Sequence, residues 1–116
     1  MDLKETMKMK NFVVVGDTLN EKKYACKIKK ELLAGGYKVA SVGKELESIN
    51  DVGFEIDVLD LCINPRAGIK LLKENKKKFK NIVIQPGAES REILEYLNKN
   101  NIPYIESCLL VGLRIY

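Results

Sequence analysis

The first chemically suggestive residues are Gly16, Asp17 and Thr18, which follow the apolar run at 12–15 and precede an amphipathic segment. A turn between a strand and a helix presents backbone N–H groups and the positive end of a helix dipole, and both favour a phosphate. The structural alternative is a tight turn in which Asp17, Thr18 or Asn20 caps the helix. Gly16 supplies one glycine of the GxGxxG fingerprint and no others follow at the required spacing, so the turn predicts a phosphate site and not a standard dinucleotide site.

Lys44 follows the second predicted strand, where NAD-binding units carry an acidic residue that accepts from the ribose hydroxyl. An ammonium group at this place pairs with a phosphorylated ribose, whereas plain NAD would lose a hydrogen-bonding partner. Lys44 is therefore either a phosphate contact or an ordinary solvated loop lysine.

Several kinds of chemistry are disfavoured by the composition. The sequence has no histidine, which removes the commonest general base and the usual zinc nitrogen ligand. Cys26, Cys62 and Cys108 form no CxxC pair and predict reduced thiols, of which Cys26 and Cys62 are expected in the core. Cys108, after the last strand, is either buried or close to the thiol end of a ligand. Asp57 and Asp60 lie three apart in a predicted strand and so point to opposite faces, which argues against a shared catalytic site.

These residues need a scaffold, and the 116-residue chain is the right length for one domain. It carries 20 basic and 16 acidic residues, and 46% of its residues are hydrophobic, as in an ordinary globular protein. Its apolar runs fall far short of the roughly 20 residues that span a bilayer. The opening ten residues lack the apolar centre of a signal peptide. We therefore expect a cytoplasmic protein without a membrane anchor.

Strands and helices alternate along the predicted chain. The pattern predicts a single α/β domain whose doubly wound parallel sheet has five strands, in a three-layer Rossmann-like arrangement. The first strand should be central, and ligands should bind at the carboxyl ends of the strands. Strands are expected at 12–15, 37–42, 56–63, 82–85 and 103–105, and helices at 20–34, 66–79 and 89–100.

The remaining segments are less regular. We expect residues 1–10 to form an extension or a short helix capped by Asp2. The polar stretch 43–55 is expected to be a connection with a short helical turn near 46–49. The lysines between 70 and 80 fit the solvated end of a helix better than a nucleic-acid patch. The apolar tail at 109–116 predicts packing on the sheet or against a second copy of the chain, as in a homodimer.

A family resemblance rests on the order of several short motifs: Val-Val-Gly-Asp-Thr at 14–18, Leu-Leu at 32–33 leading to Gly-Tyr-Lys-Val at 36–39, Ile-Asp-Val-Leu-Asp-Leu at 56–61, Gln-Pro-Gly at 85–87, and Cys108. With these motifs, residues 12–108 resemble the small single-domain CoA-binding proteins, whose Rossmann-like domain also forms the N-terminal part of succinyl-CoA ligase alpha subunits. The resemblance implies that CoA or an acyl-CoA binds at the carboxyl ends of the strands. It implies phosphate contacts from Gly16, Asp17 and Thr18, positive charge from Lys23 and Lys27, nucleoside contacts from Val42, Gly43 and Lys44, and further lining from Asn64, Pro65, Arg66, Gln85 and Gly87.

The chain departs from the family pattern at three places. Asp17 and Thr18 replace an Ala-Ser pair, Ala25 replaces a common serine, and Gly43-Lys44 replaces Asn-Pro. Asp17 would weaken phosphate binding unless its side chain points away from the ligand. Replacing Gly16 by valine is expected to block the phosphate with only partial loss of the fold.

The leading hypothesis is a non-catalytic CoA-binding protein, because no nucleophile and base pair is recognisable in the sequence. A partner subunit of an acyl-CoA ligase is one alternative. An interaction module that responds to an NADP-like nucleotide is another, and Lys44 is the residue that supports it.

Overall fold

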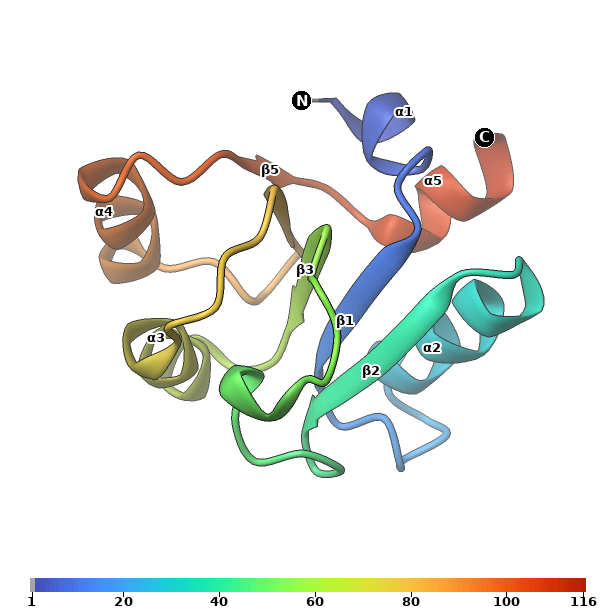
Figure 1. The fold of residues 1–116 in the computed structure, drawn as a ribbon, viewed down its shortest axis with the longest axis horizontal. Coiled ribbons are helices and arrows are strands. Elements are labelled where there is room, and N and C mark those ends of the chain that lie inside the picture. The colour runs from blue at the N-terminus through green and yellow to red at the C-terminus, as the bar shows by residue number, and fades with distance from the viewer. Residues whose placement is uncertain (1) are drawn as a thin grey trace.

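The computed structural model describes residues 2–116 and contains a parallel sheet of the predicted α/β class (Figure 1). Its strands are β1 (Asn11–Gly16), β2 (Lys38–Gly43), β3 (Val58–Cys62), β4 (Asn81–Ile84) and β5 (Tyr104–Glu106). The strand order is β2-β1-β3-β4-β5, and every neighbouring pair is parallel. The chain leaves β1 toward one edge and then returns to build the other side, so the switch point lies between β1 and β3.

Helices cover both faces of this sheet and complete the three layers (Figure 1). They are α1 (Leu3–Thr6), α2 (Tyr24–Ala34), α3 (Pro65–Glu74), α4 (Arg91–Lys99) and α5 (Leu109–Ile115), with the 3-10 turn η1 (Ile49–Asp51) after β2. One apolar cluster lies between the sheet and α3 and α4, and the other lies under α1, α2 and α5. The doubly wound arrangement predicted from the alternating elements is confirmed.

The run of apolar residues in β1 follows from burial on both faces. Val13 and Val15 belong to the cluster under α3 and α4, whereas Phe12 and Val14 belong to the cluster under α2 and α5. All four side chains are fully buried. In a strand with solvent on one face, apolar and polar residues would alternate. Because β1 is buried on both faces, its residues are apolar without alternation.

Helix α2 begins at Tyr24, later than the predicted start at residue 20. Residues before it form a turn in which the Asp17 carboxylate accepts from the backbone N–H groups of Leu19 and Asn20, both at 3.2 Å. The N-cap position belongs to Lys23, whose side chain makes no capping hydrogen bond. The alternative in which Asp17, Thr18 or Asn20 caps the helix is wrong, because α2 starts later and Asp17 instead accepts from N–H groups of its own loop.

Helix α3 ends at Glu74, well before the predicted end at residue 79. The lysines at 76–80 therefore lie in the loop before β4, and their interpretation as cations at a helix end was wrong. This loop is fixed by its own contacts, since the Lys77 ammonium donates to the carbonyl oxygen of Phe54 at 2.9 Å. The contact between Lys77 and Phe54 joins two loops, and it outweighs the tendency of the lysine-rich segment to continue the helix.

Both ends of the chain are folded against the sheet. Asp2 caps α1 by accepting from the N–H of Glu5 at 2.8 Å, as predicted. In α5, Leu109 and Leu110 are buried in the cluster with α1 and α2, whereas Val111, Ile115 and Tyr116 are exposed. The first part of the apolar tail therefore packs within its own chain, and a homodimer contact through the rest stays a prediction. Among residues 2–116, no helix is long and apolar enough to cross a membrane.

Candidate functional site

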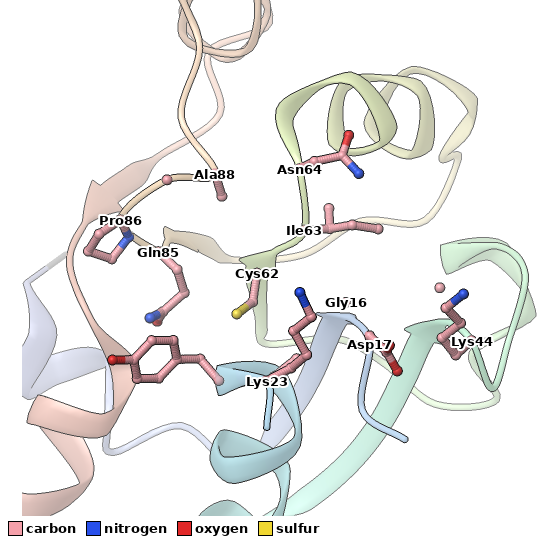
Figure 2. Close-up of a pocket in the computed structure, with 14 residues that line it drawn as sticks. Gly16, Asp17, Lys23, Lys44, Cys62, Ile63, Asn64, Gln85, Pro86 and Ala88 are labelled. Atoms are coloured by element: carbon pink, nitrogen blue, oxygen red, sulfur yellow. The ribbon is translucent and has the colours of Figure 1, made fainter. Parts of the chain in front are cut away.

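A pocket of about 550 Å³ opens at the carboxyl ends of β1, β3 and β4, where the switch point predicts a ligand site (Figure 2). Many of the residues predicted from the sequence line it together: Gly16, Asp17, Lys23, Gly43, Lys44, Asn64, Gln85 and Gly87. Residues that the sequence reasoning did not include complete the lining: Tyr24, Ala25, Cys62, Ile63, Pro86 and Ala88.

Two glycines bring bare backbone to the bottom of this pocket. A Cβ placed on Gly16 would lie 2.3 Å from the carbonyl oxygen of Cys62 and 3.0 Å from the Cβ of Ala25. Gly43 has a φ of +125°, and its Cβ would lie 3.0 Å from the carbonyl oxygen of Gly16. A side chain at position 16 would meet the backbone of β3, so Gly16→Val is expected to disturb the strand ends as well as the phosphate, and its partial effect on the fold stays a prediction.

Charged side chains stand around the opening. Lys23 comes from the start of α2 and Lys44 from the end of β2, and both are exposed. Figure 2 shows the Lys23 amino group reaching over the pocket near Cys62, while Asp17 and Lys44 lie together at the other end. Because the Asp17 carboxylate accepts from its own loop, its charge is directed away from the Lys23 end. Asp17 nevertheless lines the pocket beside Lys44, so its compatibility with a phosphate stays a prediction.

Cys62 lies at the end of β3, and its half-buried side chain packs against the core cluster under α2 and α5 and also lines the pocket, so its assignment to the core is correct only in part. Burial, with smaller contributions from the neighbouring Asp60 and Cys108, raises the pKa of this thiol to about 12. The side chain is therefore a neutral thiol near neutral pH and a poor nucleophile.

Gln85, which follows β4, lines the pocket together with Cys62, and two hydrogen bonds fix its side chain. Its Oε1 accepts from the backbone N–H of Leu109 at 2.7 Å, and its Nε2 donates to the Cys108 sulfur at 3.3 Å. Gln85 thus joins the end of β4 to the start of α5. Because both ends of the Gln85 amide group are already hydrogen-bonded within the protein, its orientation is fixed before a ligand binds.

The remaining predicted contact residues lie outside the pocket lining, and their contacts with a ligand stay predictions. Thr18 is buried and donates its hydroxyl to Glu45, and Val42 is fully buried in the core. Lys27 lies one turn along α2, with its ammonium 5.3 Å from the centre of the Tyr24 ring. Pro65 and Arg66 open α3, and Arg66 is exposed.

Tyr24 and Cys62 were missed for different reasons. The predicted helix start at residue 20 places Tyr24 inside the helix, whereas Tyr24 is the first residue of α2 and is 62% exposed. Cys62 was treated as an interior strand residue, whereas β3 ends with it. A strand end one residue earlier than predicted is enough to move a side chain from the core to the pocket.

Among residues 2–116, no group of three or more His, Cys, Asp or Glu side chains gathers that could hold a metal ion.

The parallel sheet, the switch-point pocket and the glycine turn define a Rossmann-like ligand-binding domain. The family model described as a CoA binding domain matches residues 10–114, and the chain belongs to this family. Membership supports CoA binding in general terms. No curated protein matches the chain.

Solved structures show the same fold. The chain is similar to Prb, described as the PH1109 protein redesigned for binding, with a TM-score of 0.82, 20% identity and coverage of 96% of this chain and 87% of that one. It is similar to cell-free ID.343 from Thermus thermophilus, with a TM-score of 0.82, 20% identity and coverage of 98% of each chain. A third similar structure, of an uncharacterized protein, has a TM-score of 0.69 and 27% identity over 91% of this chain and 95% of that one.

Proposed function

We propose that the chain is a non-catalytic CoA-binding protein that holds CoA or an acyl-CoA across the carboxyl ends of β1, β3 and β4. The observation that carries this proposal is the approach of bare backbone at Gly16 and Gly43 beneath two exposed lysines, Lys23 and Lys44. A pyrophosphate needs close approach to the main chain and compensating positive charge. The pocket volume of about 550 Å³ is in the range of small-molecule sites.

The pocket residues fit a nucleotide with an apolar extension. In the proposed arrangement, Gly16 and Lys23 face the pyrophosphate and Lys44 faces the phosphorylated ribose. Ile63, Pro86 and Ala88 offer apolar surface toward the pantetheine arm. Lys27 and Arg66 add positive charge at the edges, where the ligand would leave the pocket.

The same residues argue for binding without catalysis. The only thiol in the pocket lining is Cys62, whose pKa of about 12 keeps it protonated. The sequence supplies no histidine to activate a nucleophile. Asn64 and Gln85 contribute neutral amides. An acyl-CoA in this pocket would therefore meet donors and apolar surface, and no activated nucleophile. The free cysteines are also compatible with the reducing cytoplasm.

An NADP-like nucleotide is the second candidate, because Lys44 is exposed at the place where a phosphorylated ribose would lie. The nearest carboxylate along the chain, Glu45, is already bonded to Thr18 and Lys29 and is not part of the pocket lining. NAD, whose ribose hydroxyls usually meet an acidic residue after the second strand, is disfavoured because Lys44 stands at that place and Glu45 is engaged elsewhere.

Titration calorimetry of the reduced protein with CoA, dephospho-CoA, NADP and NAD tests this proposal at low and at moderate salt. We expect micromolar affinity for CoA that weakens when the 3′-phosphate is absent and when salt is raised. Tighter binding of NADP than of CoA would favour the second candidate. No heat with any of the four ligands would refute both.

A further inference from the structure

One carboxylate outside the pocket joins three parts of the chain. The Oε2 atom of Glu45 accepts from the hydroxyl of Thr18 at 2.5 Å and from the ammonium of Lys29 at 2.7 Å. Thr18 belongs to the loop after β1, Lys29 to α2, and Glu45 to the turn after β2. We call this set of residues, Thr18, Lys29 and Glu45, the Glu45 latch.

The Glu45 latch differs from the surface ion pairs of the same helix. The Thr18 side chain is buried, and the side chains of Lys29 and Glu45 are only 25% and 33% exposed. The pair formed by the next residue, Lys30 with Glu21, has a longer distance of 3.3 Å and side chains 62% and 81% exposed. Exposed pairs of that kind contribute little, whereas charge-assisted hydrogen bonds with restricted solvent access are stronger.

The same two contacts also act on the pKa of the Glu45 carboxyl group. The hydrogen bond from Lys29, followed by that from Thr18, lowers the pKa of Glu45 to about 2. The group is therefore a carboxylate across the range in which the protein would meet a ligand.

The latch is directly connected to two walls of the pocket. Asp17 precedes Thr18 and Lys44 precedes Glu45, and both Asp17 and Lys44 line the pocket. The turn that carries Lys44 is closed by a hydrogen bond of 2.7 Å from the N–H of Gly43 to the carbonyl of Leu46. In so tight a turn, a displacement of Glu45 also displaces Lys44.

We propose that Glu45 is a positioning residue of the pocket, which fixes the Asp17 and Lys44 walls at the separation that the ligand meets. The proposal rests on the proposed CoA function for its ligand. The latch has a second effect, because it holds the Glu45 charge against α2. A released carboxylate would stand beside Lys44 and compete with a phosphate for the same ammonium.

Four variants separate this role from a general effect on the fold. Glu45→Gln keeps an acceptor for Thr18 but removes the charge that faces Lys29. Thr18→Val removes the hydroxyl, and Thr18→Ser restores it. Lys30→Met is the matched control, because it breaks the exposed pair with Glu21 one residue further along α2. Thermal unfolding of each variant establishes that it is folded before it is compared.

Amide hydrogen exchange of the ligand-free protein gives the first readout. We expect residues 17–20 and 43–47 to exchange several-fold faster in both latch variants, because Thr18→Val removes the bond between the two loops and Glu45→Gln weakens the contact of the second loop with Lys29. Thr18→Ser and Lys30→Met should exchange at wild-type rates. Equal exchange in the wild type and Thr18→Val would overturn the proposal, whatever the ligand.

Calorimetry with CoA gives the second readout. We expect Thr18→Val and Glu45→Gln to bind CoA about tenfold more weakly, with Thr18→Ser and Lys30→Met within about twofold of the wild type. Wild-type affinity in the two latch variants, despite faster exchange, would overturn the positioning role. If the wild type itself binds no CoA, the proposed function fails, and the exchange comparison alone still decides whether the latch holds the two loops.

Discussion

Asp57 directly precedes β3 and Asp60 is the middle residue of that strand, yet the two carboxyl groups have pKa values shifted in opposite directions. Asp57 accepts from the backbone N–H groups of Asn11 and Lys10, at 2.9 and 3.2 Å, and pairs with Lys80 at 3.2 Å. Asp60 is fully buried, and within residues 2–116 neither of its carboxyl oxygens has a hydrogen-bond partner. Burial raises the pKa of Asp60 well above its ordinary value. Burial alone would also raise the pKa of Asp57, but its hydrogen bonds and Lys80 lower it overall.

Asp60 should make the protein less stable as the pH rises. The unfolded chain releases this proton near about pH 3.9, whereas the folded chain retains it. The stability associated with the protonated form is complete below that pH and is lost as the pH rises toward the folded pKa. Urea unfolding of Asp60→Asn should therefore show an advantage over the wild type that grows between about pH 4 and neutrality. An advantage independent of pH would contradict the ionisation argument.

Asp57→Asn is the matched comparison, because the same substitution should act in the opposite direction. Its folded pKa is lowered, so its contribution is present above the unfolded pKa and is lost as the pH falls through the folded value. We expect Asp57→Asn to destabilise the protein near neutral pH and to approach the wild type in acid. The same urea series measures this trend, and a parallel pH slope in the two variants would show that neither carboxyl group causes it.

Gly16→Ala should destabilise the protein although it adds a single methyl group. That methyl would lie 2.3 Å from the Cys62 carbonyl oxygen, so β1 and β3 must separate. Overpacking of this kind costs about 1–3 kcal/mol, which urea unfolding resolves. Gly53→Ala is the control, since a Cβ at Gly53 meets nothing within 4 Å. Equal stability of the two variants would show that the strand ends can move apart freely.

Lys44→Glu should weaken binding of CoA more than binding of dephospho-CoA. The exposed ammonium is proposed to face the 3′-phosphate, and reversing its charge replaces attraction with repulsion. We expect about a tenfold loss for CoA and about a twofold loss for dephospho-CoA, measured by calorimetry. Lys99→Glu, in the last turn of α4, changes the net charge equally and should leave both affinities near wild type. Equal losses for both ligands in Lys44→Glu would place the 3′-phosphate elsewhere.

Cys62 should resist alkylation even though it lines the pocket. With a pKa of about 12, its thiolate fraction at neutral pH is roughly a thousandfold below that of an ordinary cysteine. Iodoacetamide labelling followed by peptide mass spectrometry should find Cys62 modified far more slowly than a free peptide thiol. Labelling at the free-thiol rate would mean that the pocket holds an activated nucleophile, and it would weaken the argument against catalysis.

The sequence predicted the order of elements well because burial dictates it. The apolar run in β1 and the helical spacing of Ile28 and Leu32 reflect the faces that these residues bury. Element ends were less predictable. The start of α2 depends on the hydrogen bonds of Asp17, and the end of α3 depends on Lys77 reaching across to Phe54. The Asp17 bonds reach only two and three residues along the chain, which is a local signal typical of Asp in turns. The contact between Lys77 and Phe54 spans 23 residues and leaves no local pattern.

The candidate site shows the same division. Gly16 and Lys44 could be found because a strand end and a glycine turn have local signatures. The bond between Thr18 and Glu45 spans 27 residues, and the role of Thr18 changes once that partner is known. Placing Cys62 in the pocket lining would have required a prediction of the end of β3 to within one residue. Positions whose role depends on distant partners are visible only after the chain is folded.

The approach of main chain to main chain at Gly16 and Gly43 gives the pocket a floor without side chains. Such a floor cannot be altered by ordinary substitutions without moving the strands. Among the charged and polar lining residues, Asp17 holds its own loop and Asn64 caps α3, whereas Lys23 and Lys44 are exposed and make no capping bond. Ligand preference in this chain should therefore be open to redesign at Lys23 and Lys44 while the fold is left in place.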